Sequence, residues 1–364
     1  MKKICLIGNY SVGKNVYDGQ RLKVRLYFDI LKKENFDVLL VDLASFKRRP
    51  IHVLKMIKKY HIESDCTILI TASGGANFLI PYINRLNQKN KRRFILPLVG
   101  TSVLHNFLDR MSNDKKNKFL LEKDFTGIKR NEKLEKQLKQ IDIILPETDA
   151  ITEVFKCFFH LDNVLTMTNF RKDDCVDNNK ERNGVVYMSR IASMKGLFDL
   201  FDAIELLKNR GQLIRFDLYG PMQLNRRETN MFNNFLSKNP NVHYCGTIEQ
   251  SNVIDTISNY KFLVFPTRYI TEGTPGVLIE SLISETPIIT SNFPQARCIL
   301  KFDVDSICFD IGDVATLANS IYDLYFNSEK LKKLSDGTAE SRKKFFYNYN
   351  RKLLLECIIG ESEN

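Results

Sequence analysis

The sequence contains no apolar stretch that approaches the roughly 18 residues of a membrane-spanning helix. Only two lysines follow Met1 before a short β-like run, so the apolar core and cleavage site of a signal peptide are both missing. These absences predict a cytoplasmic protein. Peripheral attachment to the cytoplasmic face of the membrane is compatible with them.

The cysteine and histidine spacings typical of metal sites and disulfide frameworks are missing as well. The eight cysteines are scattered, with no C-x-x-C pair and no histidine at zinc-finger spacing. We therefore expect reduced cysteines and no metal site. An Asp-x-Asp at Asp303 to Asp305 reads as a turn, and we assign it no metal.

The stretch GNYSVGKN, residues 8–15, lacks only the last element of a Walker A phosphate loop. Asn15 stands where that loop needs a hydroxyl for Mg²⁺. Asp18 and Gly19 then interrupt the helix that should start at Lys14. A P-loop ATPase or GTPase is an alternative that rests on this stretch alone.

Positive charge is concentrated in one half of the chain. Residues 1–170 hold 30 Lys and Arg against 18 Asp and Glu, whereas residues 171–364 hold 24 against 25. This asymmetry favours an anionic partner for the first half, such as an acidic lipid surface. A lysine-rich solvated surface explains it equally well, and no module or aromatic-basic motif supports a nucleic-acid partner.

Short apolar runs alternate with helical stretches twice along the chain, which is typical of parallel sheets covered by helices on both faces. We predict an N-terminal Rossmann-like doubly wound domain over 1–170, a linker over 171–183 and a C-terminal Rossmann-like domain over 184–341. A last helix, about 342–364, can pack back on the first domain. The runs expected as strands in the first domain are KKICLIG, FDVLLVDL, CTILITAS, RFILPLVG, QIDIILPE and NVLTMTNF.

Two such domains facing each other leave a central cleft, and ligands of these sheets bind outside the carboxyl ends of the strands. The most informative stretch, residues 261–291, begins with a strand that ends at Phe265. A helix is expected to follow, with Thr274 as its N-cap and Pro275 at its first position. Bare backbone at Gly273 and Gly276, next to a positive helix end, predicts an anion site.

The segment EGTPGVLIESLISETPIITS within this stretch resembles the signature of the retaining GT-B-fold glycosyltransferases of the family 4, or group 1, type. Other segments are similar to further motifs of that family, in the same order: VLTMTNFR, MSRIASMKGLFDLFDAI, FDLYGPM and VHYCGTI. The signature residues that match are Glu272, Gly273, Pro275, Glu280 and Pro287, whereas Ser281, Ser284 and Glu285 replace small residues of the pattern. Because the family has a glycine at Glu285, the turn after this helix is expected to differ.

The resemblance implies a nucleotide-diphosphate-sugar donor, with a UDP-sugar favoured over a GDP-sugar, and no required cofactor or metal. It implies that Arg190, Lys195 and the amides near Thr274 to Gly276 neutralise the departing diphosphate. It further implies that Glu272 contacts the donor sugar and that Glu280 holds the ribose. His105 is the best-placed histidine for the donor sugar, and Gly13 and Gly19 are candidates for close approach to the diphosphate or the acceptor.

The family also implies an acceptor in the N-terminal domain, here a glycan or lipid-linked acceptor of cell-surface polysaccharide or glycoconjugate synthesis. A non-catalytic nucleotide-sugar-binding subunit with the same fold is the second alternative. The sequence does not specify the sugar, the linkage, the acceptor or the oligomeric state.

Overall fold

The structure is a computed structural model that describes residues 1–11, 19–172 and 181–360. The chain divides into two compact units. The N-terminal unit comprises Met1–Arg171 and Tyr347–Asn364, and the C-terminal unit comprises Lys172–Phe346. Gly13, one of the predicted contact residues, lies outside the described residues, as does Lys14.

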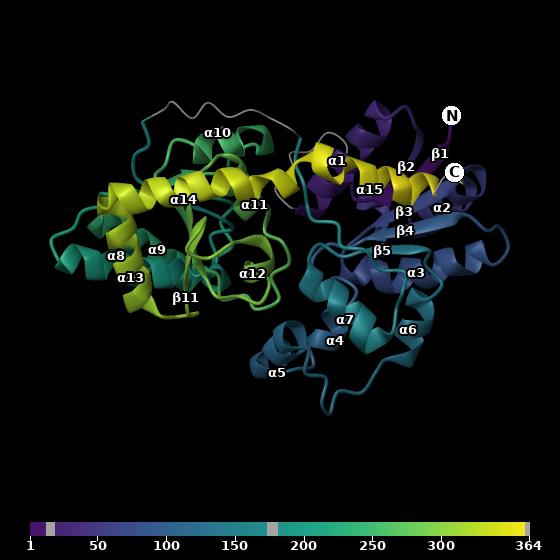
Figure 1. The fold of residues 1–364 in the computed structure, drawn as a ribbon, viewed down its shortest axis with the longest axis horizontal. Coiled ribbons are helices and arrows are strands. Elements are labelled where there is room, and N and C mark those ends of the chain that lie inside the picture. Colours follow the sequence, from purple (N-terminus) through teal and green to yellow (C-terminus); the bar gives the residue numbers. More distant parts are fainter. Residues whose placement is uncertain (12–18, 173–180, 361–364) are drawn as a thin grey trace. The chain divides into compact units, whose positions relative to one another are not determined.

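The N-terminal unit is built on a five-stranded parallel sheet with the order β2-β1-β3-β4-β5 (Figure 1). Its strands are β1 (Lys3–Gly8), β2 (Asp37–Asp42), β3 (Cys66–Ile70), β4 (Arg93–Pro97) and β5 (Ile143–Leu145). Its helices are α1 (Gly19–Lys33), α2 (Pro50–Glu63), α3 (Ser73–Asn87), α4 (His105–Leu108), α5 (Asn113–Asn117), α6 (Glu132–Leu138), α7 (Asp149–Phe159) and α15 (Tyr347–Ile359). Short turns of other helix types are η1 (Leu43–Ser45) and η2 (Lys118–Glu122).

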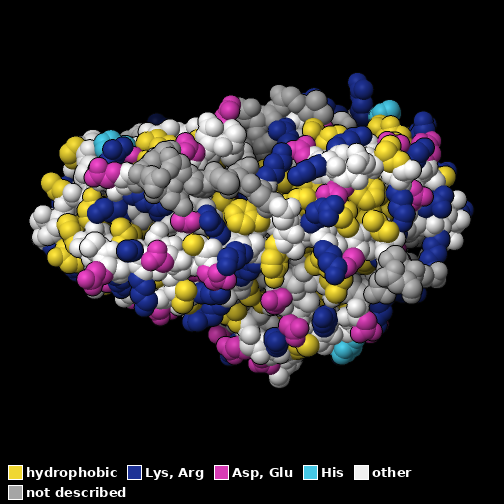
Figure 2. Space-filling view, turned by 45° about the horizontal axis from the view of Figure 1, so that its top comes forward, with side chains coloured by type: hydrophobic (Ala, Val, Ile, Leu, Met, Phe, Trp, Pro, Cys, Tyr) yellow, Lys and Arg dark blue, Asp and Glu magenta, His cyan; other side chains and the backbone are white. Residues whose placement is uncertain are grey.

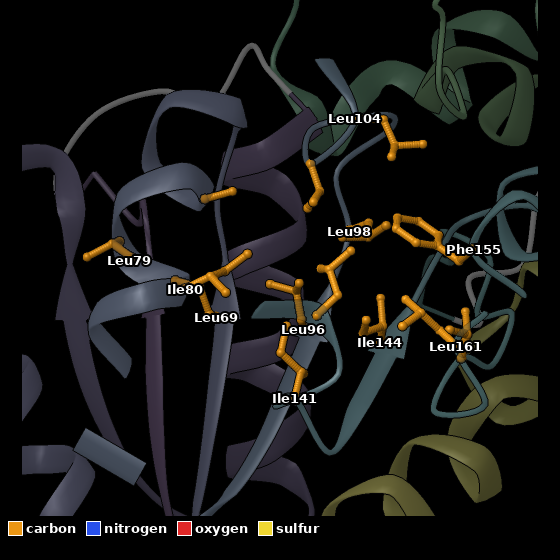
Figure 3. Packing of buried hydrophobic residues seen from close by; sticks show 14 of the residues in the cluster. Leu69, Leu79, Ile80, Leu96, Leu98, Leu104, Ile141, Ile144, Phe155 and Leu161 are labelled. Carbon is orange, nitrogen blue, oxygen red and sulfur yellow. The ribbon is translucent and has the colours of Figure 1, made fainter. Parts of the chain in front are cut away.

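Helices cover both faces of this sheet. On one face, α1 and α15 pack over alternate strand residues such as Ile4 and Ile68. On the other face, α2, α3 and α7 pack over Ile7 and Leu69. Figure 3 shows this second core, where Leu69, Leu96 and Ile144 from three strands point toward side chains of α3 and α7. The apolar strand runs of the sequence are therefore explained by burial on both sides.

The C-terminal unit contains a six-stranded parallel sheet with the order β11-β10-β9-β6-β7-β8. Its strands are β6 (Val185–Met188), β7 (Phe216–Tyr219), β8 (Val242–Gly246), β9 (Phe262–Phe265), β10 (Ile288–Ser291) and β11 (Ser306–Phe309). Its helices are α8 (Leu197–Asn209), α9 (Arg226–Lys238), α10 (Val253–Ile257), α11 (Gly276–Ile283), α12 (Ala296–Ile299), α13 (Val314–Phe326) and α14 (Ser328–Ser341). The turns η3 (Ser193–Lys195), η4 (Gln250–Asn252) and η5 (Arg342–Phe345) connect them.

The two faces of this second sheet are also covered by different helices. Residues of α8, α9 and α13 form one core with alternate strand residues, and residues of α10, α11 and α12 form the other. The predicted α/β class with two Rossmann-like sheets is confirmed. No helix within the described residues is long and apolar enough to cross a membrane.

Two local predictions are wrong. Residues 163–170 do not form a strand, because only Val164 pairs with β5, in an isolated bridge. The last helix, expected over about 342–364, begins only at Tyr347, since α14 ends at Ser341 and the turn η5 follows it. Between η5 and α15 the backbone of Phe346 is extended, with φ −88° and ψ 151°. Phe345 and Tyr347, on either side of this break, are buried in different hydrophobic cores.

The basic residues counted in the sequence do not form a single field on the surface that Figure 2 shows. On that face Lys and Arg side chains alternate with Asp and Glu over both units (Figure 2). On this face, an anion site would have to arise from the local arrangement of charges rather than from net charge.

A buried carboxylate stabilises the β7 and β8 region of the C-terminal unit. Asp217 accepts hydrogen bonds from the guanidinium of Arg215 (2.7 Å) and the hydroxyl of Tyr260 (2.6 Å), and its Oδ1 lies 3.0 Å from Nδ1 of His243. Burial alone would raise the pKa of Asp217, but these hydrogen bonds and the Arg215 charge hold it below its ordinary value.

We therefore expect Asp217→Asn to lower the free energy of unfolding by about 1–3 kcal/mol at neutral pH. Because the folded-state pKa is depressed, this contribution is present above the unfolded pKa of about 4 and is lost as the pH falls below it. Urea denaturation at neutral pH and near pH 3 measures both values. An equal gap between wild type and variant at the two pH values would contradict the expectation.

Candidate functional site

The strand order of the C-terminal unit predicts where a ligand-binding crevice lies. From β6 the chain continues to β7 on one side, and it later returns to β9 on the other side of β6. Loops that leave the carboxyl ends of β6 and β9 therefore diverge, and in open parallel sheets ligands bind at such a point. The predicted residues 190–196 follow β6, and residues 266–276 follow β9.

The two loops are locked to each other through their backbones. The amide of Arg268 donates to the carbonyl of Met194 at 3.0 Å. Gly196 has a φ of +71°, and a Cβ atom placed there would lie 1.8 Å from the carbonyl oxygen of Pro266. This position therefore requires glycine both for its left-handed backbone and for the close approach of the other loop.

Lys195 and Glu272 meet where these loops touch. The ammonium of Lys195 donates a hydrogen bond to Oε1 of Glu272, and both residues are buried, with 7% and 8% exposure. The hydroxyl of Thr267 donates to the same carboxylate oxygen at 3.1 Å. The rings of Phe265 and Tyr269 lie 5.8 and 5.6 Å from the ammonium. A buried ion pair persists only with such close charge and hydrogen-bond compensation.

Arg190 and Glu280 are held by amide side chains from neighbouring loops. The exposed guanidinium of Arg190 donates to Oε1 of Gln223 at 3.3 Å. Glu280, which is buried within α11, accepts a hydrogen bond from Gln250 at 2.7 Å. Gln223 follows β7 and Gln250 follows β8, so loops from four strand ends contribute to this edge of the sheet.

The start of α11 corrects one prediction. Thr274 is not the N-cap and Pro275 is not the first helical residue, because the helix begins at Gly276 with Pro275 at the N-cap position. Pro275 has an extended ψ of 123°, so regular helix geometry starts one residue later. No side chain caps this end, and Gly273, Thr274 and Gly276 surround it. The backbone amides of the first turn therefore retain the capacity to bind an anion.

The end of α11 forms the turn for which the resembling family has a glycine. Glu285 adopts a left-handed conformation with a φ of +54°. The amide of Thr286 donates to the carbonyl of Ser281, and the Glu285 carboxylate pairs with Arg342 at 2.8 Å. Tertiary contacts thus hold a glycine-type turn without a glycine, against a conformational cost of about 1–2 kcal/mol.

The side chains that position the predicted residues could not be identified from the sequence. Thr267, Gln223 and Gln250 are polar residues in loops and belong to no recognisable motif. Arg268 forms a bidentate pair with the buried carboxylate of Asp199 in α8, at 2.5 and 2.7 Å. These partners are distant in sequence and become neighbours only through the strand order.

The remaining predicted residues belong to the N-terminal unit. His105 begins α4, and its Nδ1 lies 3.3 Å from Oδ1 of Asp109 one turn later. Gly19 is the exposed first residue of α1. The structure thus brings Lys195, Glu272, Arg190 and Glu280 to one edge of the C-terminal sheet, while His105 and Gly19 lie in the other unit.

No cluster of three or more His, Cys, Asp or Glu side chains with metal-binding geometry occurs among residues 1–11, 19–172 and 181–360. Asp305 of the Asp-x-Asp pair is buried and accepts the amide of Lys301 at 2.9 Å. Asp303 has a left-handed backbone, with a φ of +63°. The pair therefore forms a turn.

Comparison with known proteins adds a family match and relatives of similar fold. Residues 170–341 match the model of the family described as glycosyl transferases group 1. Over 156 residues the chain is 27% identical to the capsular polysaccharide biosynthesis glycosyltransferase CapM of Staphylococcus aureus, a match that spans 43% of this chain and 40% of CapM.

Two solved structures share the fold over nearly the whole chain. Sucrose-phosphate synthase from Thermosynechococcus elongatus is 14% identical, with a TM-score of 0.75 and full coverage of both chains. HepE from Anabaena, solved with UDP and glucose, is 12% identical, with a TM-score of 0.71 and coverage of 99% of this chain and all of HepE. At such identities the similarity concerns the fold.

The contact at Gly196 leads to a stability prediction. Gly196→Ala should lower the free energy of unfolding by more than about 2 kcal/mol, because the methyl group meets Pro266 and the left-handed backbone is strained. Gly211→Ala is the matched control, since Gly211 has a φ of +76° and open space around it. Its cost should be only about 1 kcal/mol. Urea denaturation compares the two variants, and equal losses would show that the loop contact contributes nothing.

Proposed function

Residues 170–341 match the family model of the glycosyl transferases group 1, and from this match we propose that the protein is a retaining, metal-independent glycosyltransferase. It moves a sugar from a nucleotide-diphosphate sugar to a glycan or lipid-linked acceptor. The observation that carries the proposal is the buried contact between Lys195 and Glu272 at the divergent loops of β6 and β9. There a cation, a carboxylate and a helix N-terminus lie at one edge of the sheet.

A UDP-sugar is the favoured donor. HepE, which shares the fold, was solved with UDP and glucose, and the relative CapM is described as a glycosyltransferase of capsular polysaccharide biosynthesis. In our assignment Glu280 holds the two ribose hydroxyls, as a buried carboxylate with accepting oxygens can. Gln250 now occupies one of those oxygens and would shift or share it when the donor binds.

Departure of the diphosphate is the step that needs most assistance. The bond between the anomeric carbon and the β-phosphate oxygen breaks, which leaves negative charge on the diphosphate and positive charge on the sugar ring. Arg190, Lys195 and the first amides of α11 stabilise that negative charge. Glu272 binds donor-sugar hydroxyls, and its contact with Lys195 holds both side chains in position.

The acceptor oxygen attacks the anomeric carbon from the face that the diphosphate leaves, so the configuration is retained. A phosphate oxygen of the leaving group takes the acceptor proton, and the products are a nucleoside diphosphate and a glycoside. His105 and the glycines Gly13 and Gly19 are proposed to contact donor or acceptor from the N-terminal unit. The acceptor is bound by that unit, with a cell-surface polysaccharide or glycoconjugate as product.

The two alternatives make different predictions. A P-loop nucleotidase built on residues 8–15 would bind and hydrolyse Mg-ATP or Mg-GTP in a manner that Lys14→Ala abolishes. A non-catalytic subunit would bind nucleotide sugars without turnover. The buried contact between Lys195 and Glu272 supports the glycosyltransferase over the nucleotidase, because it lies in the C-terminal unit and involves none of residues 8–15. The presence of Glu272, Glu280, Arg190 and Lys195 supports it over a non-catalytic subunit.

The donor is tested by thermal unfolding with UDP-, GDP- and dTDP-sugars, followed by slow hydrolysis of each. We expect one UDP-sugar at about 100 times its Kd to stabilise the protein by about 2.7 kcal/mol. Glu272→Gln and Arg190→Ala should lower kcat/KM for its hydrolysis by about 100-fold or more. No stabilisation by any nucleotide sugar would overturn the proposal.

Arg210→Ala is the matched control for Arg190→Ala. Arg210 is an exposed arginine of the same unit, and it also donates to an amide side chain, that of Asn319, at 2.7 Å. It follows the C-terminus of α8, at the amino edge of the sheet, so its loss should leave hydrolysis unchanged. Equal losses in both variants would show that Arg190 has no special role.

A further inference from the structure

The N-terminal unit contains a cavity of about 870 Å³ that the site described above does not use. Its walls come from α3, α4, α5, α6 and the loop before α6. This volume is typical of pockets that hold small organic ligands, which run from roughly 300 to 1,000 Å³. All of its lining residues lie in one unit and within the described part of the chain.

The inner part of the cavity is apolar. Ile80, Val103, Phe107, Ile128 and Leu134 line it, all of them buried or half-buried. The ring of Phe107 packs in a cluster of other phenylalanines, with a centroid distance of 5.4 Å to the nearest. Such a surface is suited to hydrocarbon and offers few hydrogen bonds to a free sugar.

The walls are held together without a ligand. The amide group of Asn84 in α3 donates to the backbone carbonyl and to the side-chain oxygen of Gln137 in α6, both at 2.9 Å. The side chain of Asn131 caps α6 by accepting the amide of Leu134 at 3.1 Å. The cavity is therefore preformed, which lowers the entropy lost on binding.

Five cations surround this apolar surface, from three separate segments: Arg110, Lys115, Lys129, Arg130 and Lys133. Glu132 is the one acidic residue in the lining. Within the described part of the chain, none of the five cations forms an ion pair with a carboxylate.

Neighbouring lysines outside the cavity behave differently. Lys118 pairs with Asp114 at 3.4 Å, Lys123 with Glu153 at 3.4 Å and Lys139 with Glu135 at 2.7 Å. These three lysines are paired, whereas the five exposed cations of the cavity lining have no carboxylate within ion-pair distance among the described residues. Clustered like charges raise the free energy of the unit, and an anion bound among them would lower it.

We propose that this cavity binds the phosphate-bearing end of a lipid-linked acceptor, an assignment that deepens the proposed function and rests on it. The cations contact the phosphate, and the apolar residues contact the first carbons of the lipid chain. Both halves of the cavity are used only by a ligand that is anionic and apolar at once. Neither inorganic phosphate nor an uncharged lipid meets this condition.

The location suits an acceptor. Val103 and Asn106 of the lining follow the carboxyl end of β4, the edge at which ligands of parallel sheets bind. His105, next to Asn106, starts α4 at the same edge. A sugar attached to the bound phosphate would therefore lie near the carboxyl edge of this sheet, while the lipid chain stays among apolar side chains.

The test uses the full chain, which contains no tryptophan. Asn106→Trp places a single fluorescent reporter at an exposed position of the cavity wall. Farnesyl phosphate is the probe, with farnesol and inorganic phosphate as partial ligands. We expect farnesyl phosphate to change the fluorescence saturably and to bind at least about tenfold more tightly than either partial ligand. Equal affinity for farnesol or for inorganic phosphate would overturn the assignment.

In the same background, Arg110→Gln with Arg130→Gln should weaken farnesyl phosphate binding by at least about tenfold. Lys123→Gln with Lys139→Gln is the matched control, because it removes the same charge from ion-paired positions outside the cavity and should leave binding unchanged. Equal weakening in both pairs would mean that only overall charge matters and would also overturn the assignment. Unchanged unfolding temperatures identify variants that fold.

The donor experiment separates this inference from the proposed function. Stabilisation by a UDP-sugar without farnesyl phosphate binding would overturn the cavity assignment and leave the glycosyltransferase proposal intact. Farnesyl phosphate binding without stabilisation by any nucleotide sugar would overturn the glycosyltransferase proposal, and the cavity would then be a lipid-phosphate site of another activity.

Discussion

A lysine ammonium buried against a carboxylate constrains the whole carboxyl edge of the C-terminal sheet. Lys195 and Glu272 must stay within contact, because separating them would leave a charge in a poorly solvated place. The close approach of Gly196 to the Pro266 carbonyl and the hydrogen bond from the Arg268 amide to the Met194 carbonyl hold the two loops at the separation that this pair needs. Loop conformation at this edge follows from the need to keep one charge pair together.

Much of the architecture could be predicted, because buried parallel strands appear in the sequence as apolar runs with helical stretches between them. Lys195 and Glu272 were singled out by motifs 77 residues apart, yet their contact depends on β6 lying beside β9. The supporting polar residues, such as Thr267 and Gln223, carry no local pattern. Residues 163–170 show the opposite case, since an apolar run with strand character pairs at a single residue.

The position of an anion site in this protein is indicated by which basic side chains have a partner carboxylate and which do not. The excess of basic residues in the first half was compatible with an anionic partner and equally with a lysine-rich solvated surface, and it gave no location for a ligand. The structure distinguishes lysines that already have a carboxylate, such as Lys123 and Lys139, from those around the cavity that have none in the described chain. Each of these side chains carries the same charge, and the presence of a partner carboxylate distinguishes them.

The break in the helical path at Phe346 has a consequence for how the chain is made. The N-terminal unit takes Tyr347, Leu354 and Cys357 into its core, although these residues follow the entire C-terminal unit in sequence. During synthesis the first 171 residues leave the ribosome long before α15 does, so the face of their sheet that α1 and α15 share is at first covered by α1 without α15. The unit that is translated first is therefore completed last.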